Sequence, residues 1–160
     1  MHIPNNNRVE YLAFDCAIGE FDAKFTIGIN ESANQVSISS RPQWNMPRDK
    51  FAATVLYITL LNYRLAIGST DIDMDDGEVR FKTTAVFGSA GNISPILESL
   101  MKVHVHSGVH YLEGFTAIKN NDASAETALR IAGVETEGSA STGESTAELI
   151  LRLMRTSISR

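Results

Sequence analysis

Residues 21–30, FDAKFTIGIN, carry an apolar side chain at every odd position and a polar residue or glycine at every even one. A period of two places one face of a β-strand on a core and the other face in water. Residues 9–18 precede this segment across the short Gly19–Glu20 link, and a third strand is expected at 35–41 after a turn. We therefore predict three antiparallel strands joined as a meander.

The chain from about residue 48 to 66 predicts a helix that is apolar on more than one side. One stripe at helical spacing consists of Phe51, Val55 and Ile58. Tyr57 and Leu60 lie outside that stripe, and a helix of this kind has to bury more than one face. We expect another element of the chain or a second copy of the protein to cover the second face. We predict self-association through Tyr57 and Leu60.

A hairpin and a second helix complete the predicted domain. The turn Asp75–Gly77 separates two alternating segments, at 70–74 and 79–85, and Asp-Gly at such a place is a strong hairpin signal. Ser94 and Pro95 then open a helix that extends to about residue 117. The predicted fold class is α+β, with a meander, a helix, a hairpin and a helix in one domain at 1–118.

The amino-acid composition of the chain changes after residue 118. Residues 119–144 are rich in Ala, Ser, Thr, Gly and Glu, which is typical of a flexible acidic linker. In the C-terminal segment 145–160, Ser145 and Glu148 form a capping-box pattern that opens a short amphipathic helix. We expect this helix to dock on the domain or on a partner protein through Leu149, Ile150, Leu153 and Met154.

Composition excludes several classes of protein. The chain has 160 residues, 43% of them hydrophobic, a formal net charge of −5 and no Lys/Arg cluster, which argues against nucleic-acid binding. It has no signal-peptide pattern and no apolar run of about 20 residues, so we expect a cytoplasmic protein that does not associate with a membrane. Its single cysteine, Cys16, excludes an internal disulfide, and we expect a buried structural thiol. No nucleotide-binding or nucleophile motif is present, and we predict no enzymatic activity and no cofactor.

Two groups of side chains resemble parts of metal sites. Asp71, Asp73 and Asp75 have the spacing that opens a calcium loop, but the glycine and glutamate that such a loop needs later are missing. His106 and His110 lie four residues apart on the predicted helix, close to Glu113, and two histidines at that spacing can bind zinc. A third ligand is missing, and we predict that folding needs no divalent metal. A small-ligand or metal-binding protein that uses these three residues remains the alternative hypothesis.

The sequence also singles out two further aromatic residues, Trp44 and His104. Trp44 lies between Pro42 and Pro47, outside regular structure, where it either packs over the sheet edge or anchors a partner protein. His104 is expected nearer the core than His106. A ligand pocket between the sheet and the second helix is neither supported nor excluded by the sequence.

A resemblance to a known family extends over about residues 10–118. The runs LLNYRLAIG at 60–68 and DDGEVRF at 75–81 resemble the YbjN-like family of bacterial sensory-transduction regulators, which is similar in fold to the class I type III secretion chaperones. The resemblance implies a non-enzymatic α+β domain, often dimeric, that regulates or holds protein clients. The chain departs from the family because residues 1–8 leave no room for a helix before the first strand. We expect a chaperone-like, protein-binding or regulatory module that acts as a homodimer.

Overall fold

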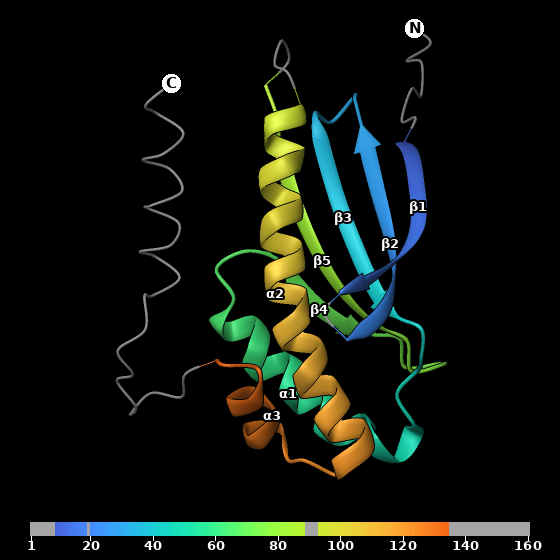
Figure 1. The fold of residues 1–160 in the computed structure, drawn as a ribbon, viewed down its shortest axis with the longest axis vertical. Coiled ribbons are helices and arrows are strands. Elements are labelled where there is room, and N and C mark those ends of the chain that lie inside the picture. The colour runs from blue at the N-terminus through green and yellow to red at the C-terminus, as the bar shows by residue number, and fades with distance from the viewer. Residues whose placement is uncertain (1–8, 19, 89–92, 135–160) are drawn as a thin grey trace, which may run out of the picture.

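The computed structural model describes residues 9–18, 20–88 and 93–134 and confirms an α+β fold (Figure 1). Five strands and three α-helices follow one another with a short 3-10 helix, η1, before α1. In chain order they are β1 (Val9–Ile18), β2 (Phe21–Asn30), β3 (Gln35–Pro42), η1 (Arg48–Lys50), α1 (Phe51–Arg64), β4 (Ser69–Ile72), β5 (Val79–Val86), α2 (Ser94–Asn121) and α3 (Ala125–Ile131).

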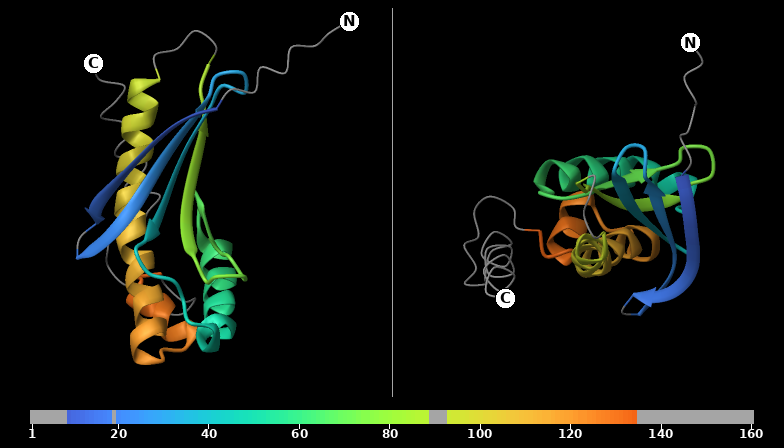
Figure 2. Two further views of the ribbon diagram at one scale, coloured as in Figure 1. Left: turned by 90° about the vertical axis from the view of Figure 1, so that its right-hand side faces the viewer. Right: turned by 90° about the horizontal axis from the view of Figure 1, so that it is seen from above.

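The strands form one antiparallel sheet in the order β1-β2-β3-β5-β4. The predicted meander is therefore present, and β5 pairs with β3 so that the second hairpin extends the same sheet. In one row across the sheet Phe14 pairs with Phe25, Phe25 with Ser40, and Ser40 with Phe81. The sheet curves, and α2 runs along the face that these side chains share, which we call the inner face (Figure 2).

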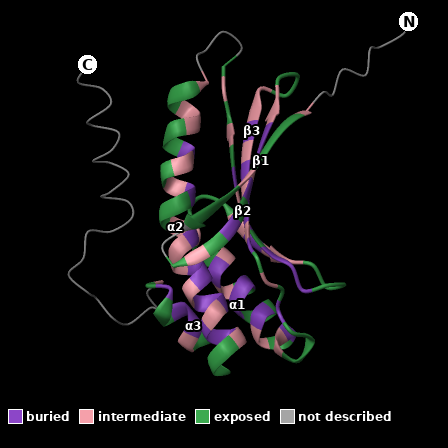
Figure 3. Cartoon of the chain, turned by 45° about the vertical axis from the view of Figure 1, so that its right-hand side comes forward, coloured by how far each residue is buried: buried purple, intermediate pink, exposed green. Residues whose placement is uncertain are grey.

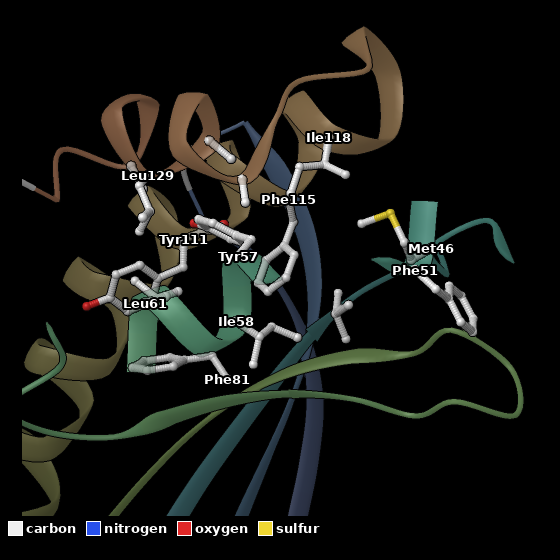
Figure 4. Packing of buried hydrophobic residues seen from close by; sticks show 14 residues of the cluster. Met46, Phe51, Tyr57, Ile58, Leu61, Phe81, Tyr111, Phe115, Ile118 and Leu129 are labelled. Carbon is white, nitrogen blue, oxygen red and sulfur yellow. The ribbon is translucent and has the colours of Figure 1, made fainter. Parts of the chain in front are cut away.

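Two apolar clusters make up the core. The sheet cluster joins the inner face of β2 and β3 to α2 through residues such as Phe25, Ile38 and Leu100. The helical cluster lies where α1, α2 and α3 meet at the end of the sheet that carries β4 (Figure 4). Its labelled members are Met46, Phe51, Tyr57, Ile58, Leu61, Phe81, Tyr111, Phe115, Ile118 and Leu129.

The structure corrects the first part of the predicted flexible linker. Helix α2 continues to Asn121, Asp122 adopts a left-handed conformation with φ of 52°, and α3 begins after Ser124. The Ser124 hydroxyl accepts a hydrogen bond from the Thr127 amide, which is an N-cap. Small residues let α3 lie close to its neighbours, and Ala125, Ala128 and Leu129 are buried. In the sequence this segment resembles a linker, because alanine makes the close helix contact without the large apolar side chains that usually mark a buried helix. The rest of the predicted linker, at 135–144, and the segment at 145–160 lie outside the described residues.

The structure also corrects the predicted faces of α1. Helix α3 packs against one side of α1 and β4 against another, so an element of the chain itself covers the second face. The covered arc carries Tyr57, Ile58 and Leu61, and Tyr57 is 0% exposed. Tyr57 is therefore inaccessible to a partner, and Leu60 is half-buried against the helical cluster. Val55, which we expected on the core stripe, is 40% exposed.

The second hairpin turns as predicted, with one difference. Gly77 has a φ of 82°, and a Cβ there would overlap the Met46 carbonyl oxygen. The Met46 amide in turn donates to the Gly77 carbonyl at 2.8 Å, so the turn is held against the chain that leads into α1. Strand β4 ends at Ile72, and Met74 is 53% exposed in the turn rather than on a buried face.

Candidate functional site

His104 of α2 is the central polar side chain of the inner face. It is 0% exposed, and its Nδ1 and Nε2 atoms lie 2.9 Å from Thr83 Oγ1 and 2.8 Å from Ser40 Oγ. The rings of Phe25 and Phe81 flank it at centroid distances of 5.6 Å and 4.7 Å. Phe25 belongs to the sheet cluster and Phe81 to the helical cluster, so His104 joins the two halves of the core.

Burial lowers the pKa of His104 from its ordinary 6.5 to about 4. The cause is desolvation, which disfavours the charged imidazolium. The ring is therefore neutral at physiological pH, and a neutral imidazole donates from one nitrogen and accepts at the other. Each of the two hydroxyl groups supplies the complementary role. The expectation that His104 lies near the core is confirmed.

A serine next to a histidine is also the pairing that activates a nucleophile. Ser40 is only 4% exposed, however, and the cavity that it lines beneath α2 has a volume of ≈ 10 Å³. Such a space holds about one water molecule. It leaves no room for a substrate at Ser40 or for an organic ligand between the sheet and α2 at this point.

A larger hollow, of ≈ 360 Å³, opens on the opposite face of the sheet. Its lining includes Asp15, Lys24 and Arg41, so acidic and basic groups are mixed. Arg41 also forms an ion pair with Glu78, which pairs with Arg80 as well. The positive charge at this hollow is thus largely compensated, which gives little selectivity for an anionic ligand.

His106 and His110 lie side by side on the exposed surface of α2. Their ring centroids are 5.3 Å apart, and Glu113 Oε2 is 3.8 Å from His110 Nδ1. Within the described residues no group of three or more His, Cys, Asp or Glu side chains could hold a metal ion. The three residues of the alternative hypothesis are therefore neighbours, but they do not form a complete coordination set on one chain.

The acidic residues of the second hairpin have structural partners. Asp73 Oδ1 accepts a hydrogen bond from the Asp75 amide at 2.9 Å, and Asp71 forms an ion pair with Lys82. Carboxylates that accept backbone amide hydrogen bonds two residues on are typical of turns. These contacts explain the acidic spacing without a calcium ion.

Trp44 packs against the helical cluster and is half-buried. The Lys119 ammonium lies 5.3 Å from the centre of its ring, which is a cation–π contact. Packing over the end of the core is thus the interpretation that these contacts favour. A partner role for Trp44 stays a prediction.

The outward side of α1 carries exposed apolar side chains, among them Val55, which the sequence had predicted on the core stripe. Val55, Leu56 and Tyr63 are 40%, 46% and 87% exposed. The exposed Ala52 and Thr59 lie on the same side of the helix, three or four residues from the nearest of these side chains, and we call the five residues the α1 stripe. The spacing was visible in the sequence, but the choice between two apolar faces depended on where α3 packs.

Strand β1 is the second exposed apolar surface. It is an edge strand, and no strand pairs with its outer edge within the described part of the chain. Tyr11 and Leu12 are 71% and 61% exposed on opposite faces, and Figure 3 shows much of the strand as exposed. Cys16 is exposed as well, which corrects the expected buried thiol.

The remaining predicted contacts, Leu149, Ile150, Leu153 and Met154, lie outside the described residues. None of the helices that the structure describes is long and apolar enough to cross a membrane. The resemblance to the YbjN-like regulators stays a prediction. No protein-family model matches the chain, and no curated protein sequence is significantly similar to it.

Proposed function

We propose that the protein is a non-enzymatic, chaperone-like binding module that acts as a homodimer. The observation that carries the proposal is the α1 stripe. The chain covers one side of α1 with α3, yet leaves Leu56 and Tyr63 of the other side open to solvent. A contiguous exposed apolar surface is the usual mark of a protein-interaction site.

A second copy fits this surface because the stripe runs along a straight, regular helix. Two such helices related by a two-fold axis bury the same residues on each chain, which is the commonest geometry of homodimers. Fully burying a large apolar side chain contributes about 1.5–3 kcal/mol before entropy is subtracted. Val55, Leu56 and Tyr63 of both chains contribute six such side chains to the proposed interface.

The client segment is proposed to bind along β1. An edge strand presents unpaired backbone amides and carbonyls to which an extended peptide adds as a further strand. β1 has ten residues, and Tyr11 and Leu12 offer an apolar contact on each face of an added strand. Dimerisation through α1 leaves this edge accessible, because β1 and α1 lie on different parts of the molecule (Figure 1).

Sedimentation of the full-length chain tests the homodimer. We expect a dimer for the wild type at micromolar concentrations and a monomer for Leu56→Glu, because glutamate keeps the helical propensity and places a charge on the stripe. Met74→Glu is the matched control, since Met74 is equally apolar and 53% exposed but lies in the second hairpin. A monomeric wild type, or a Leu56→Glu variant that dimerises like the wild type, contradicts the proposal.

Amide hydrogen exchange tests the proposed client edge. A synthetic peptide of alternating valine and threonine should protect the β1 amides that point away from β2. The same peptide with proline at every second position should not, because proline lacks the amide hydrogen needed for strand pairing. If the first peptide leaves the amide exchange of β1 unchanged, the proposal that extended segments bind at this edge is wrong.

A further inference from the structure

We propose that His106 and His110 form a two-imidazole clip for a divalent transition-metal ion of the zinc class on the exposed face of α2. Glu113 orients the His110 ring in this proposal. The site goes beyond the proposed binding module and is independent of the α1 stripe and of β1.

The spacing of the two rings is the first support. Zn–N bonds are about 2.0–2.1 Å long and structural zinc is tetrahedral, so with each ring centre about 1.1 Å behind its nitrogen, two bound imidazoles have centroids about 5.2 Å apart. The centroids of His106 and His110 are 5.3 Å apart. Residues four apart face the same way on a helix, and α2 is one continuous helix from Ser94 to Asn121. The two rings, whose planes are inclined by 82°, therefore already lie at the centroid separation of a chelating pair.

The position of Glu113 is the second support. Its carboxylate lies 3.8 Å from Nδ1 of His110. In metalloproteins the ring nitrogen that does not bind the metal commonly donates to a carboxylate, which fixes the tautomer and the orientation of the ring. At 3.8 Å the two atoms are not hydrogen-bonded, but the carboxylate lies on the Nδ1 side of the ring, so we assign metal binding to Nε2 of His110. Glu113 thus acts through His110, as a positioning residue.

Accessibility separates this pair from the third histidine of the helix. The side chain of His110 is 46% exposed and that of Glu113 is 41% exposed, and His106 is exposed as well. Both ring nitrogens of His104, by contrast, are occupied by Ser40 and Thr83 in the core. A metal ion in solution can reach the first pair and cannot reach His104.

The neighbouring charges do not block the clip. Lys102 lies one helical turn before His106, and its ammonium is held by Glu98 at a distance of 2.6 Å. That ion pair draws the Lys102 ammonium toward the N-terminal end of α2. Imidazole ligands suit Zn²⁺, Ni²⁺ and Cu²⁺, whereas Ca²⁺ and Mg²⁺ prefer oxygen ligands.

The clip leaves coordination positions open. Two imidazoles occupy two of the four positions of zinc, and the described residues supply no third protein ligand. Water, a side chain of a bound client or the same pair on a second copy completes the set.

Calorimetric titration of the full-length, chelator-dialysed protein with Zn²⁺ tests the clip. We expect saturable binding, weakened more than about tenfold by His106→Ala or by His110→Ala and about tenfold by Glu113→Gln. His2→Ala is the matched control, because His2 is the one remaining histidine besides His104 and should leave the affinity unchanged. Ca²⁺ should give no saturable heat.

Imidazole NMR signals supply a second readout that a change of fold would not mimic. The signals of His106 and His110 should shift or broaden on addition of Zn²⁺, while that of His104 should not. Absence of saturable binding, binding retained in the His106→Ala/His110→Ala double variant, or binding lost in His2→Ala overturns the proposal. An unchanged affinity in Glu113→Gln removes Glu113 from it.

Discussion

The covered and uncovered sides of the two long helices carry the same kinds of side chain with opposite environments. On α1, Tyr57 is 0% exposed and Tyr63 is 87% exposed. On α2, His104 is 0% exposed, whereas His106 is open to solvent only two positions later. Residue type therefore says little here about burial. A side chain is buried when it lies on the side of the helix that faces α3 or the sheet.

The two sides of each helix therefore have different roles. On the covered sides Tyr57 and His104 use their polar atoms internally: Tyr57 donates to the Tyr111 carbonyl at 3.2 Å, and His104 bonds two hydroxyl groups. On the uncovered sides the stripe on α1 and the histidine pair on α2 remain open to other molecules. Substitutions on the covered sides should change stability, and those on the uncovered sides should change binding.

On the covered sides, Gly114→Ala should cause the largest decrease in the free energy of unfolding. A Cβ at Gly114 would overlap the hydroxyl group of Tyr57 and lie 3.0 Å from the Ala128 carbonyl oxygen. Overpacking a core typically costs about 1–3 kcal/mol, and rigid neighbours on two sides place this variant at about 3 kcal/mol or more. Urea unfolding measures the loss. Gly88→Ala is the control, because a Cβ there meets nothing within 4 Å, and equal effects of the two substitutions would refute the close contact.

Acid should destabilise the protein through His104. Its folded pKa of about 4 lies below the unfolded value of 6.5, so the unfolded chain binds the proton more tightly. The free energy of unfolding keeps its full value above pH 6.5. It decreases as the pH falls toward 4, by up to about 3 kcal/mol, because the unfolded chain binds the proton and the folded chain does not. Denaturant unfolding at several pH values should show a smaller decrease for His104→Gln, which keeps one donor and one acceptor but does not titrate. Parallel pH profiles would mean that His104 does not carry the effect.

Tyr57→Phe should cost about 1 kcal/mol, because it removes one buried hydrogen bond but little volume. Thermal unfolding of the single variant measures this cost. The same substitution frees space for a side chain at position 114, so it should partly restore stability to Gly114→Ala. A double-mutant cycle measures this coupling, and strictly additive effects would place the two residues out of contact.

Tyr63→Ser should have the smallest effect on stability. The side chain is 87% exposed, and surface substitutions of this kind usually stay within about 0.5 kcal/mol. Chemical unfolding at a protein concentration below the dimer range is the measurement. A loss of several kcal/mol would show that the outward side of α1 is buried in the single chain, and the contrast with Tyr57 would disappear.

Local patterns in the sequence were sufficient for the strands, the hairpin and the order of the elements up to α2. The alternation in residues 21–30 and the glycine at position 77 report the conformation of the backbone where they occur. They predicted β2 with its correct bounds and a turn in the correct place. The extent of α2 was also largely predictable, since only its last turn, up to Asn121, lay beyond the expected end.

Only the tertiary structure decided which sides are covered. The alanine-rich residues of α3 look like a linker in sequence, because their contribution depends on how closely α1 and α2 approach them. Once α3 packs on α1, Tyr57 becomes a core residue and Val55 a surface residue, the reverse of the prediction. The same holds for His104, whose partners Ser40 and Thr83 come from strands 64 and 21 residues away. Helical periodicity shows that a helix has apolar faces, but contacts between distant segments determine which of them is buried.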